Sequence, residues 1–186
     1  NYSSLGIWTI NLHRQLPDIL DDGLFIDGSS QATFIGEDMN PNGPEIEIQG
    51  ANSINIGLNI LGDNFTISHL NLNRFVNTHI SVWNAQNGII AGCYIGTNAT
   101  GSSTLGKAVR GITLSSSQNI SIIPWNNTPN IIAGHDDLDI FLAGSKKNII
   151  SGNILGLNST KKKVLDTPAT VGMQFQDDAD SNLVEN

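Results

Sequence analysis

Cysteine, aromatic residues and charge are all scarce in this 186-residue chain, and no long hydrophobic run occurs in it. The single cysteine, Cys93, excludes an internal disulfide, and its apolar neighbours favour a buried, inert thiol over a nucleophile. No apolar stretch approaches the roughly 18 residues of a membrane-spanning helix, so we expect no membrane insertion. The sequence has neither an initiator Met nor a signal peptide, which indicates a processed or trimmed chain.

Positive charge is scarcer than negative charge. Only 14% of residues are charged, and 17 acidic against nine basic side chains leave a net charge of −8. This balance argues against a nucleic-acid backbone or an anionic membrane surface as a partner. The one concentrated basic run, at 161–163, lies in a predicted loop and is typical of a solvated loop tip, with an anion contact as the alternative.

Long helical patterns are also missing. The best candidate, residues 12–20, is interrupted by Pro17. Apolar residues instead alternate with polar ones over short runs that are separated by Gly, Asn, Asp and Ser, which predicts short strands joined by tight turns. These runs lie at 24–26, 46–48, 56–60, 65–67, 70–72, 80–82, 112–114, 120–122, 140–142 and 173–175.

An internal repeat is the most informative feature that is present. Residues 89–105 (IIAGCYIGTNATGSSTL) and 149–165 (IISGNILGLNSTKKKVL) are identical at seven ungapped positions, and after one extra residue 111–114 aligns with 172–175. Repeats of this kind bury their apolar faces against neighbouring repeats. The repeat therefore predicts a solenoid.

The spacing of the expected strands defines the fold further. Strand starts are separated by 21 to 34 residues, which suits one turn of a β-coil with two or three short strands, and the matched segments 98–109 and 158–170 should protrude on the same side, two coils apart. We predict an all-β fold, a right-handed single-stranded parallel β-helix (β-solenoid) of about five to six coils. It forms a single domain over 1–186, with initial coils over 1–56 and regular repeats over 57–186, continuing or stacking beyond both ends.

The inward positions of these strands give a predicted core. It consists of Ile26, Ile48, Ile60, Ile67, Leu72, Ile80, Ile95, Ile112, Leu114, Ile132, Ile140, Leu142, Ile150, Leu155 and Phe175.

Four phrases resemble a known family. Residues 93–106 (CYIGTNATGSSTLG) resemble the NYIGTDATGTxxLG signature of secreted and surface right-handed parallel β-helix repeat proteins, within the pectate-lyase-like superfamily. The segments 111–134, 16–28 and 66–75 are similar to further units of these proteins, in the same order. The resemblance implies the β-helix fold and an extracellular or cell-surface location, but no activity, because a fold alone does not transfer one.

Two functions remain open on these grounds. The first is a non-catalytic extracellular structural or surface module. The alternative is a polysaccharide lyase or glycoside hydrolase, since β-helix enzymes of these classes use clustered carboxylates with Ca²⁺ or a general acid. The catalytic candidates under the alternative are Asp136, Asp137, Asp177 and Asp178, although Asp in turns also bonds its own backbone.

Other chemistry-bearing residues are scattered. Asp139, Asp180, Arg74 and Arg110 accompany the acidic clusters, and the histidines at 69, 79 and 135 look isolated. The ten-residue separation of the first two histidines is not a metal-ligand spacing, so we expect no metal and no cofactor, with Ca²⁺ only under the enzyme alternative.

Glycans and carbohydrate are the remaining partners to consider. Six N-glycosylation signals begin at Asn98, Asn158, Asn64, Asn119, Asn126 and Asn1, and the repeat-matched pair in the protruding loops is the best placed. Otherwise these asparagines are turn residues. Trp8, Trp83 and Trp125 could bind carbohydrate if exposed, or pack in the core or an interface.

Both ends of the sequence look like strands without caps. The segments 7–12 and 181–186 are strand-like, so we expect either trimming or head-to-tail pairing of these segments between copies, as a homo-oligomer or filament. The assembly residues would be Ile7, Trp8, Ile10, Leu183 and Val184.

Overall fold

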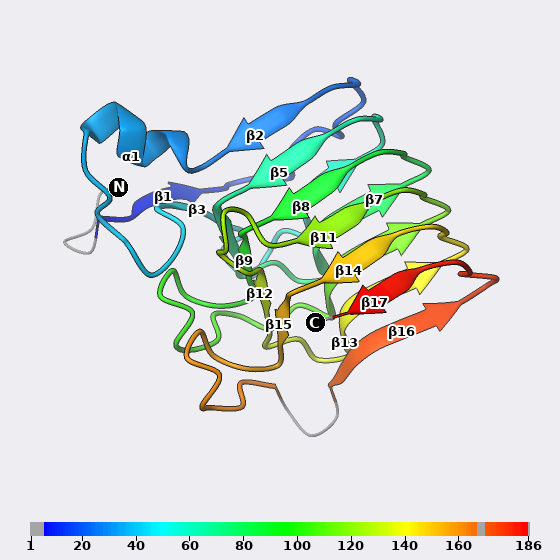
Figure 1. Cartoon of the computed structure of the whole chain (residues 1–186). Helices are drawn as coiled ribbons and strands as arrows, with labels where there is room; N and C mark the ends of the chain where they lie inside the picture. The colour runs from blue at the N-terminus through cyan, green and yellow to red at the C-terminus, as the bar shows by residue number, and fades with distance from the viewer. Residues whose placement is uncertain (1–5, 167–169, 186) are drawn as a thin grey trace.

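The computed structural model describes residues 6–166 and 170–185, which form three sheets of short, parallel strands (Figure 1). Sheet A contains β1 (Trp8–Asn11), β3 (Ile46–Gln49), β6 (Leu70–Asn73), β9 (Tyr94–Ile95), β12 (Ile131–Ile132) and β15 (Ile154–Leu155) in that spatial order. Sheet B contains β4 (Ile56–Ile60), β7 (Thr78–Trp83), β10 (Arg110–Ser115), β13 (Leu138–Ala143) and β16 (Val171–Gln176). Sheet C contains β2 (Phe25–Asp27), β5 (Thr66–Ser68), β8 (Ile89–Ala91), β11 (Ser121–Ile123), β14 (Ile149–Ser151) and β17 (Leu183–Glu185).

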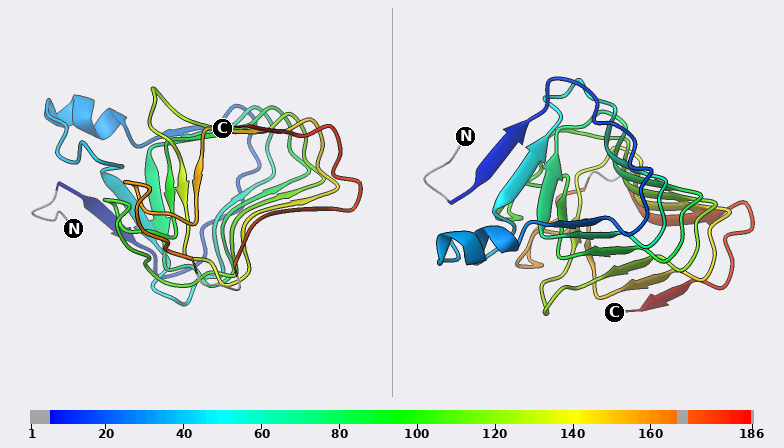
Figure 2. Two further views of the ribbon diagram at one scale, coloured as in Figure 1. Left: turned by 60° about the horizontal axis from the view of Figure 1, so that its bottom comes forward. Right: turned by 90° about the horizontal axis from the view of Figure 1, so that it is seen from above.

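The chain visits the three sheets in rotation. From β4 onward the order is B, C, A, repeated to the end, so each coil adds one strand to every sheet and pairs with the coils before and after it. The coils lie over one another when seen in the left panel of Figure 2. A nearly all-β fold with sheets of six, five and six parallel strands is compatible with the predicted parallel β-helix.

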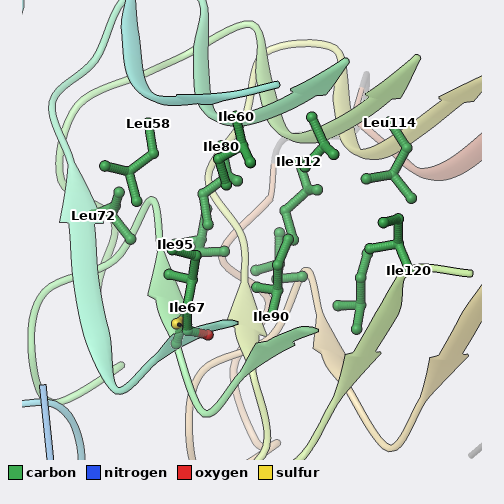
Figure 3. Packing of buried hydrophobic residues seen from close by; sticks show 14 of the residues in the cluster. Leu58, Ile60, Ile67, Leu72, Ile80, Ile90, Ile95, Ile112, Leu114 and Ile120 are labelled. Atoms are coloured by element: carbon green, nitrogen blue, oxygen red, sulfur yellow. Dashed lines mark hydrogen bonds between the residues drawn. The ribbon is translucent and has the colours of Figure 1, made fainter. Parts of the chain in front are cut away.

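The core lies between the three sheets. Figure 3 shows Leu58, Ile80 and Ile112 in one row, with Leu72 and Ile95 coming from another sheet. Each buried Ile or Leu contributes about 1.5–3 kcal/mol by leaving water. Twelve of the predicted core residues are buried: Ile48, Ile60, Ile67, Leu72, Ile80, Ile95, Ile112, Leu114, Ile132, Ile140, Leu142 and Ile150.

The other three predicted core residues are less buried, because their coils lie near the ends of the stack. Ile26 and Leu155 are only partly buried, although both pack against the core. The prediction for Phe175 is wrong, because this side chain is 40% exposed. It lies in β16, the last strand of sheet B, where no further coil of the described chain covers it.

Two long connections leave sheet A on one side. One follows β9 and one follows β15, as the repeat predicts, and each closes on itself through an antiparallel bridge, Thr97 with Thr104 and Leu157 with Val164. The two loops touch, since the backbone N–H of Ser159 donates to the Gly101 carbonyl at 2.8 Å.

The helix α1 (Ser30–Ile35) was not predicted. It projects away from the sheets (Figures 1 and 2), buries none of its side chains and ends at Gly36, whose left-handed backbone lets its N–H reach the Ala32 carbonyl. Six residues are too few to leave a helical pattern in a sequence. Within the described part of the chain no helix is long and apolar enough to cross a membrane.

Candidate functional site

The four candidate catalytic aspartates do not converge. Asp136 and Asp137 directly precede β13, at the start of sheet B, whereas Asp177 and Asp178 follow β16, at its far end. A six-residue strand spans about 20 Å. The two carboxyl groups of a glycosidase lie within about 9.5 Å of each other, so the two pairs do not form one site.

Within each pair, the aspartates make the exposed ion pairs and turn contacts that are common on protein surfaces. Asp136 lies 4.0 Å from Lys107 and Asp137 lies 3.8 Å from Arg110, with both carboxylates about half exposed. Asp177 and Asp178 have left-handed backbone, with φ of 55° and 58°, which is the turn role that was left open for them. Nearby, Asp180 forms an exposed ion pair with Lys146.

A buried polar cluster lies between sheets A and B. His135 Nδ1 lies 2.6 Å from Asp139 Oδ1, and its Nε2 lies 3.3 Å from His79 Nδ1. All three side chains are buried, and the ring of Phe75 packs edge-to-face on His79. These two histidines look isolated in the sequence because 56 residues separate them.

Glycines make the space for this cluster. The parallel register places Gly111 between His79 and Asp139 on neighbouring strands. A Cβ at Gly111 would lie 2.5 Å from the Asp139 carbonyl oxygen and 2.8 Å from His135 Cε1. On sheet A, a Cβ at Gly96 would lie 3.0 Å from His135 Nε2. At both positions a side chain would collide with the His135 ring, so glycine is required there.

Burial favours the neutral form of each group in this cluster. Desolvation lowers the pKa of His79 to about 4, against a weaker opposing effect of the Arg110 carbonyl. Desolvation, with the neighbouring His79, lowers the pKa of His135 well below its usual value. Desolvation and then the charge of Asp166 raise the pKa of Asp139 to about 9.

These pKa shifts determine which group donates and which accepts in each hydrogen bond of the cluster. A protonated Asp139 donates to His135 Nδ1, which leaves the Nε2–H of His135 to donate to His79 Nδ1. Because all three side chains are buried, a substrate in solution does not reach them in this structure.

An accessible polar cleft lies at the corner between sheets C and A. Two adjoining hollows of about 130 and 260 Å³ share Asp38, Gly43 and His69 in their walls. His69, between β5 and β6, adopts a left-handed backbone with φ of 49°, which is uncommon for a residue other than glycine. The indole of Trp125 meets the His69 ring edge-on, with 6.1 Å between ring centroids.

Asp27 holds Ser29, a residue that lines the smaller hollow of this cleft. Its Oδ1 accepts hydrogen bonds from the Ser29 N–H at 2.9 Å and from the Ser68 hydroxyl at 3.0 Å. Burial would raise the pKa of Asp27, but the hydrogen bonds from Ser29 and Ser68 and the charge of His69 together lower it. Burial lowers the pKa of His69. The negative charges of Asp27 and Asp38 act in the opposite direction, but their effect is smaller.

Glu45 also lines the smaller hollow of this cleft. Its Oε1 accepts from the backbone N–H groups of Met39 at 2.5 Å and Asn40 at 3.3 Å, which shapes the segment between α1 and β3. Its side chain is 5% exposed and lines the smaller hollow, and Oε2 has no hydrogen-bond partner. This site was not predicted from the sequence, because its residues come from separate parts of the chain, at 28–45, 69, 94 and 127–129.

The glycosylation candidates have turn roles. Asn98 Oδ1 accepts from the backbone N–H of Ser102, and Asn158 Oδ1 accepts from Lys162 and Lys163 in the equivalent loop. Three others, Asn64, Asn119 and Asn126, are exposed and have left-handed backbone, while Asn1 lies outside the described residues.

The three tryptophans do not lie together on one surface where they could bind a carbohydrate jointly. Trp8 belongs to sheet A, Trp83 ends β7 in sheet B, and Trp125 lies in the turn between β11 and β12. Cys93 is fully buried, as predicted, and burial raises the pKa of its thiol to about 12.

The comparisons with known proteins add no relative: no family model, curated protein or solved structure matches this chain. Among the described residues, no group of three or more His, Cys, Asp or Glu side chains is arranged to hold a metal ion. The surface aspartates, the buried histidine cluster and the corner cleft are therefore interpreted from their geometry.

Proposed function

We propose that this chain is a non-catalytic structural module of an extracellular or cell-surface protein, which stacks end to end with further copies of itself. The finer fold that we propose is a right-handed single-stranded parallel β-helix, supported by the rotation of the chain through three parallel sheets. The extracellular location is supported by the resemblance of residues 93–106 to secreted repeat proteins. The separation of the four aspartates along sheet B leaves the lyase or hydrolase alternative without a site to support it.

The observation that carries this proposal is the apolar end formed by β15, β16 and β17. A hollow of about 510 Å³ opens there, and interior side chains of the last coil line it, among them Ile150, Leu155, Met173 and Val184. An exposed apolar surface of this kind marks a contact site, for a further coil of a longer chain or for a second copy of this one.

Register-matched residues show how much this end differs from the middle of the stack. Leu142 in β13 is fully buried, whereas its partner Phe175 in β16 is 40% exposed. Ile150 in β14 is 2% exposed, whereas its partner Val184 in β17 is 46% exposed. One further coil would bury these side chains and pair the outer strand edges.

A second copy can supply that coil because the opposite end presents the same sheets. Sheet C begins with β2, where Phe25 is 59% exposed, and sheet A begins with β1, where Ile10 is 49% exposed. A copy moved along the stacking direction therefore sets β2 on β17 and β1 on β15. This pairing replaces the one expected from sequence, since segments 7–12 and 181–186 lie in different sheets. The contact is head to tail and propagates.

Replacing Val184 with Lys should prevent stacking. β17 pairs with β14 through the Leu183 N–H and the Glu185 carbonyl. Because backbone groups alternate along a strand, the Val184 N–H points to the outer edge of the sheet. A lysine at this position places a charge at the contact between two copies. Sedimentation of the 186-residue chain should show oligomers that grow with concentration, whereas Val184→Lys should sediment as a monomer.

The matched control is Val76→Lys. Val76 is 41% exposed and lies in the turn between β6 and β7, on the side of the stack. This variant should still assemble. A wild-type chain that stays monomeric at high concentration, or assembly that Val184→Lys leaves unchanged, would reject the stacking proposal.

A further inference from the structure

The loop that follows β15 is covered on one side only, whereas its counterpart after β9 has two neighbours. On one side of the β9 loop, the Asn40 side-chain amide donates to the Ala99 carbonyl at 2.9 Å. On the other side, the Ser159 N–H donates to the Gly101 carbonyl at 2.8 Å. Ser159 belongs to the loop after β15, in which residues 160–163 are exposed. Within the described chain, this second loop therefore has a neighbour on one side and solvent on the other.

The three elements in this series are regularly spaced along the stack. Sheet A has the order β1-β3-β6-β9-β12-β15, so the segment 36–45 that leads into β3, the loop after β9 and the loop after β15 follow one another at intervals of two strands. Figure 1 shows them in this order along one side of the molecule, in cyan, green and orange. Two strands of a sheet span about 10 Å. The next element of the series would lie two strands beyond β15.

A second copy of the chain supplies that element. In the proposed stack, β1 of the next copy pairs with β15, so β3 of that copy is the second strand beyond β15. The segment 36–45 of the next copy then meets the loop after β15, at the same interval as the two contacts within one chain. This inference therefore rests on the proposed stacking.

The charges of these two surfaces are complementary. Residues 1–47 contain eight of the 17 acidic side chains and one basic side chain, whereas residues 146–163 contain five of the nine basic side chains and no acidic one. The lysines at 161–163 are exposed, as are Glu37 and Asp38 in the facing segment. None of these five side chains forms an ion pair with another described residue. Opposite charges on facing surfaces favour association, and like charges oppose it.

We propose that the lysines at 161–163 of one copy bind Glu37 and Asp38 of the next copy. The apolar end of the stack supplies the attraction between copies, and this charged contact selects the end of the partner that it accepts. Two copies that met by their acidic ends would place like charges together. The contact therefore keeps the stack head to tail.

Charge reversal on either surface tests the contact by sedimentation. Lys162→Glu/Lys163→Glu keeps the backbone N–H bonds of both residues to Asn158, so the loop should fold. This variant and Glu37→Lys/Asp38→Lys should each associate at least about tenfold more weakly than the wild type, because like charges then face each other. An equal mixture of the two variants should recover assembly, since the reversed loop of one meets the reversed segment of the other.

Asp136→Lys/Asp137→Lys is the matched control. It changes the net charge by the same amount as Glu37→Lys/Asp38→Lys, but at the start of sheet B and not on the segment 36–45. This variant should assemble alone, and it should not recover the assembly of the lysine variant.

Three results would overturn the contact and leave stacking in place when the wild type assembles. These are unchanged assembly of the lysine variant, which would assign the lysines to a different anionic partner, a mixture of the two reversed variants that stays as weak as either alone, and equal recovery by the control. A wild type that stays monomeric would reject stacking and this contact together. Melting curves of each variant confirm that a loss of assembly is not a loss of fold.

Discussion

Replacing Asp139 with Asn is expected to make the protein progressively more stable than the wild type as the pH rises from about 4 to about 9. In the wild type, burial raises the pKa of Asp139 from 3.8 to about 9, so the folded state keeps a proton that the unfolded state has already released. The stabilising effect of this raised pKa is fully present below pH 3.8 and is lost as the pH rises toward 9. The loss amounts to as much as about 1.4 kcal/mol for each pH unit.

The Asn variant removes this dependence and keeps the geometry. Its amide N–H₂ can donate to His135 Nδ1, as the protonated carboxyl does in the wild type. The two histidines remain, and with lowered folded pKa values they reduce stability as the pH falls from 6.5, down to about 4 for His79. The variant should therefore lose stability on the acid side only.

Urea unfolding at a series of pH values measures this effect as the difference in free energy between variant and wild type. Asp136→Asn is the control, since an exposed ion pair contributes at most about 1 kcal/mol and its loss should shift all curves uniformly. An alkaline decline that persists unchanged in Asp139→Asn would show that Asp139 ionises normally in the folded protein.

The second large effect is expected from a single methyl group at Gly111. Gly111→Ala should lower the free energy of unfolding by about 3 kcal/mol or more, because its Cβ would overlap the Asp139 carbonyl oxygen and the His135 ring. The carbonyl belongs to a paired strand and cannot move away without breaking the sheet.

Gly172→Ala is the control at the equivalent register position, one strand beyond Asp139. There the nearest atom to an added Cβ is Leu155 Cδ1, at 3.9 Å. Its stability should stay within about 0.5 kcal/mol of the wild type, as for an ordinary surface change. Chemical unfolding of the two variants checks the difference, and equal losses would mean that the space beside His135 is not the cause.

The sequence predicts the parts of this structure that depend on periodicity. Alternation placed Ile80 and Ile112 in the core, and the repeat placed the loops after β9 and β15 on one side. Periodicity says which face of a strand is buried, but not how many coils cover it. For this reason the prediction failed at Phe175.

The polar sites depend on register, which the sequence did not reveal. His79 and His135 meet only because the intervening coil carries Gly96 and Gly111, and neither glycine is distinctive among 19. The corner cleft combines residues 28–45 with His69, Tyr94 and residues 127–129, which belong to three later coils. Such sites follow from the stacking of turns in space, and a residue list without the strand pairing does not bring them together.

The contact between the two protruding loops has a consequence for how the stack comes apart. Ser159 donates through its N–H to the Gly101 carbonyl and through its hydroxyl to the Thr100 carbonyl, over a coil that has no such loop. In most repeat arrays each unit is held only by its nearest neighbours, so units can fray singly. Here the coils of β9 and β15 are tied directly, across the coil of β12. Local opening at the β15 end must therefore break a link to a unit two steps away, and hydrogen exchange in this region should occur in blocks of three coils and not one at a time.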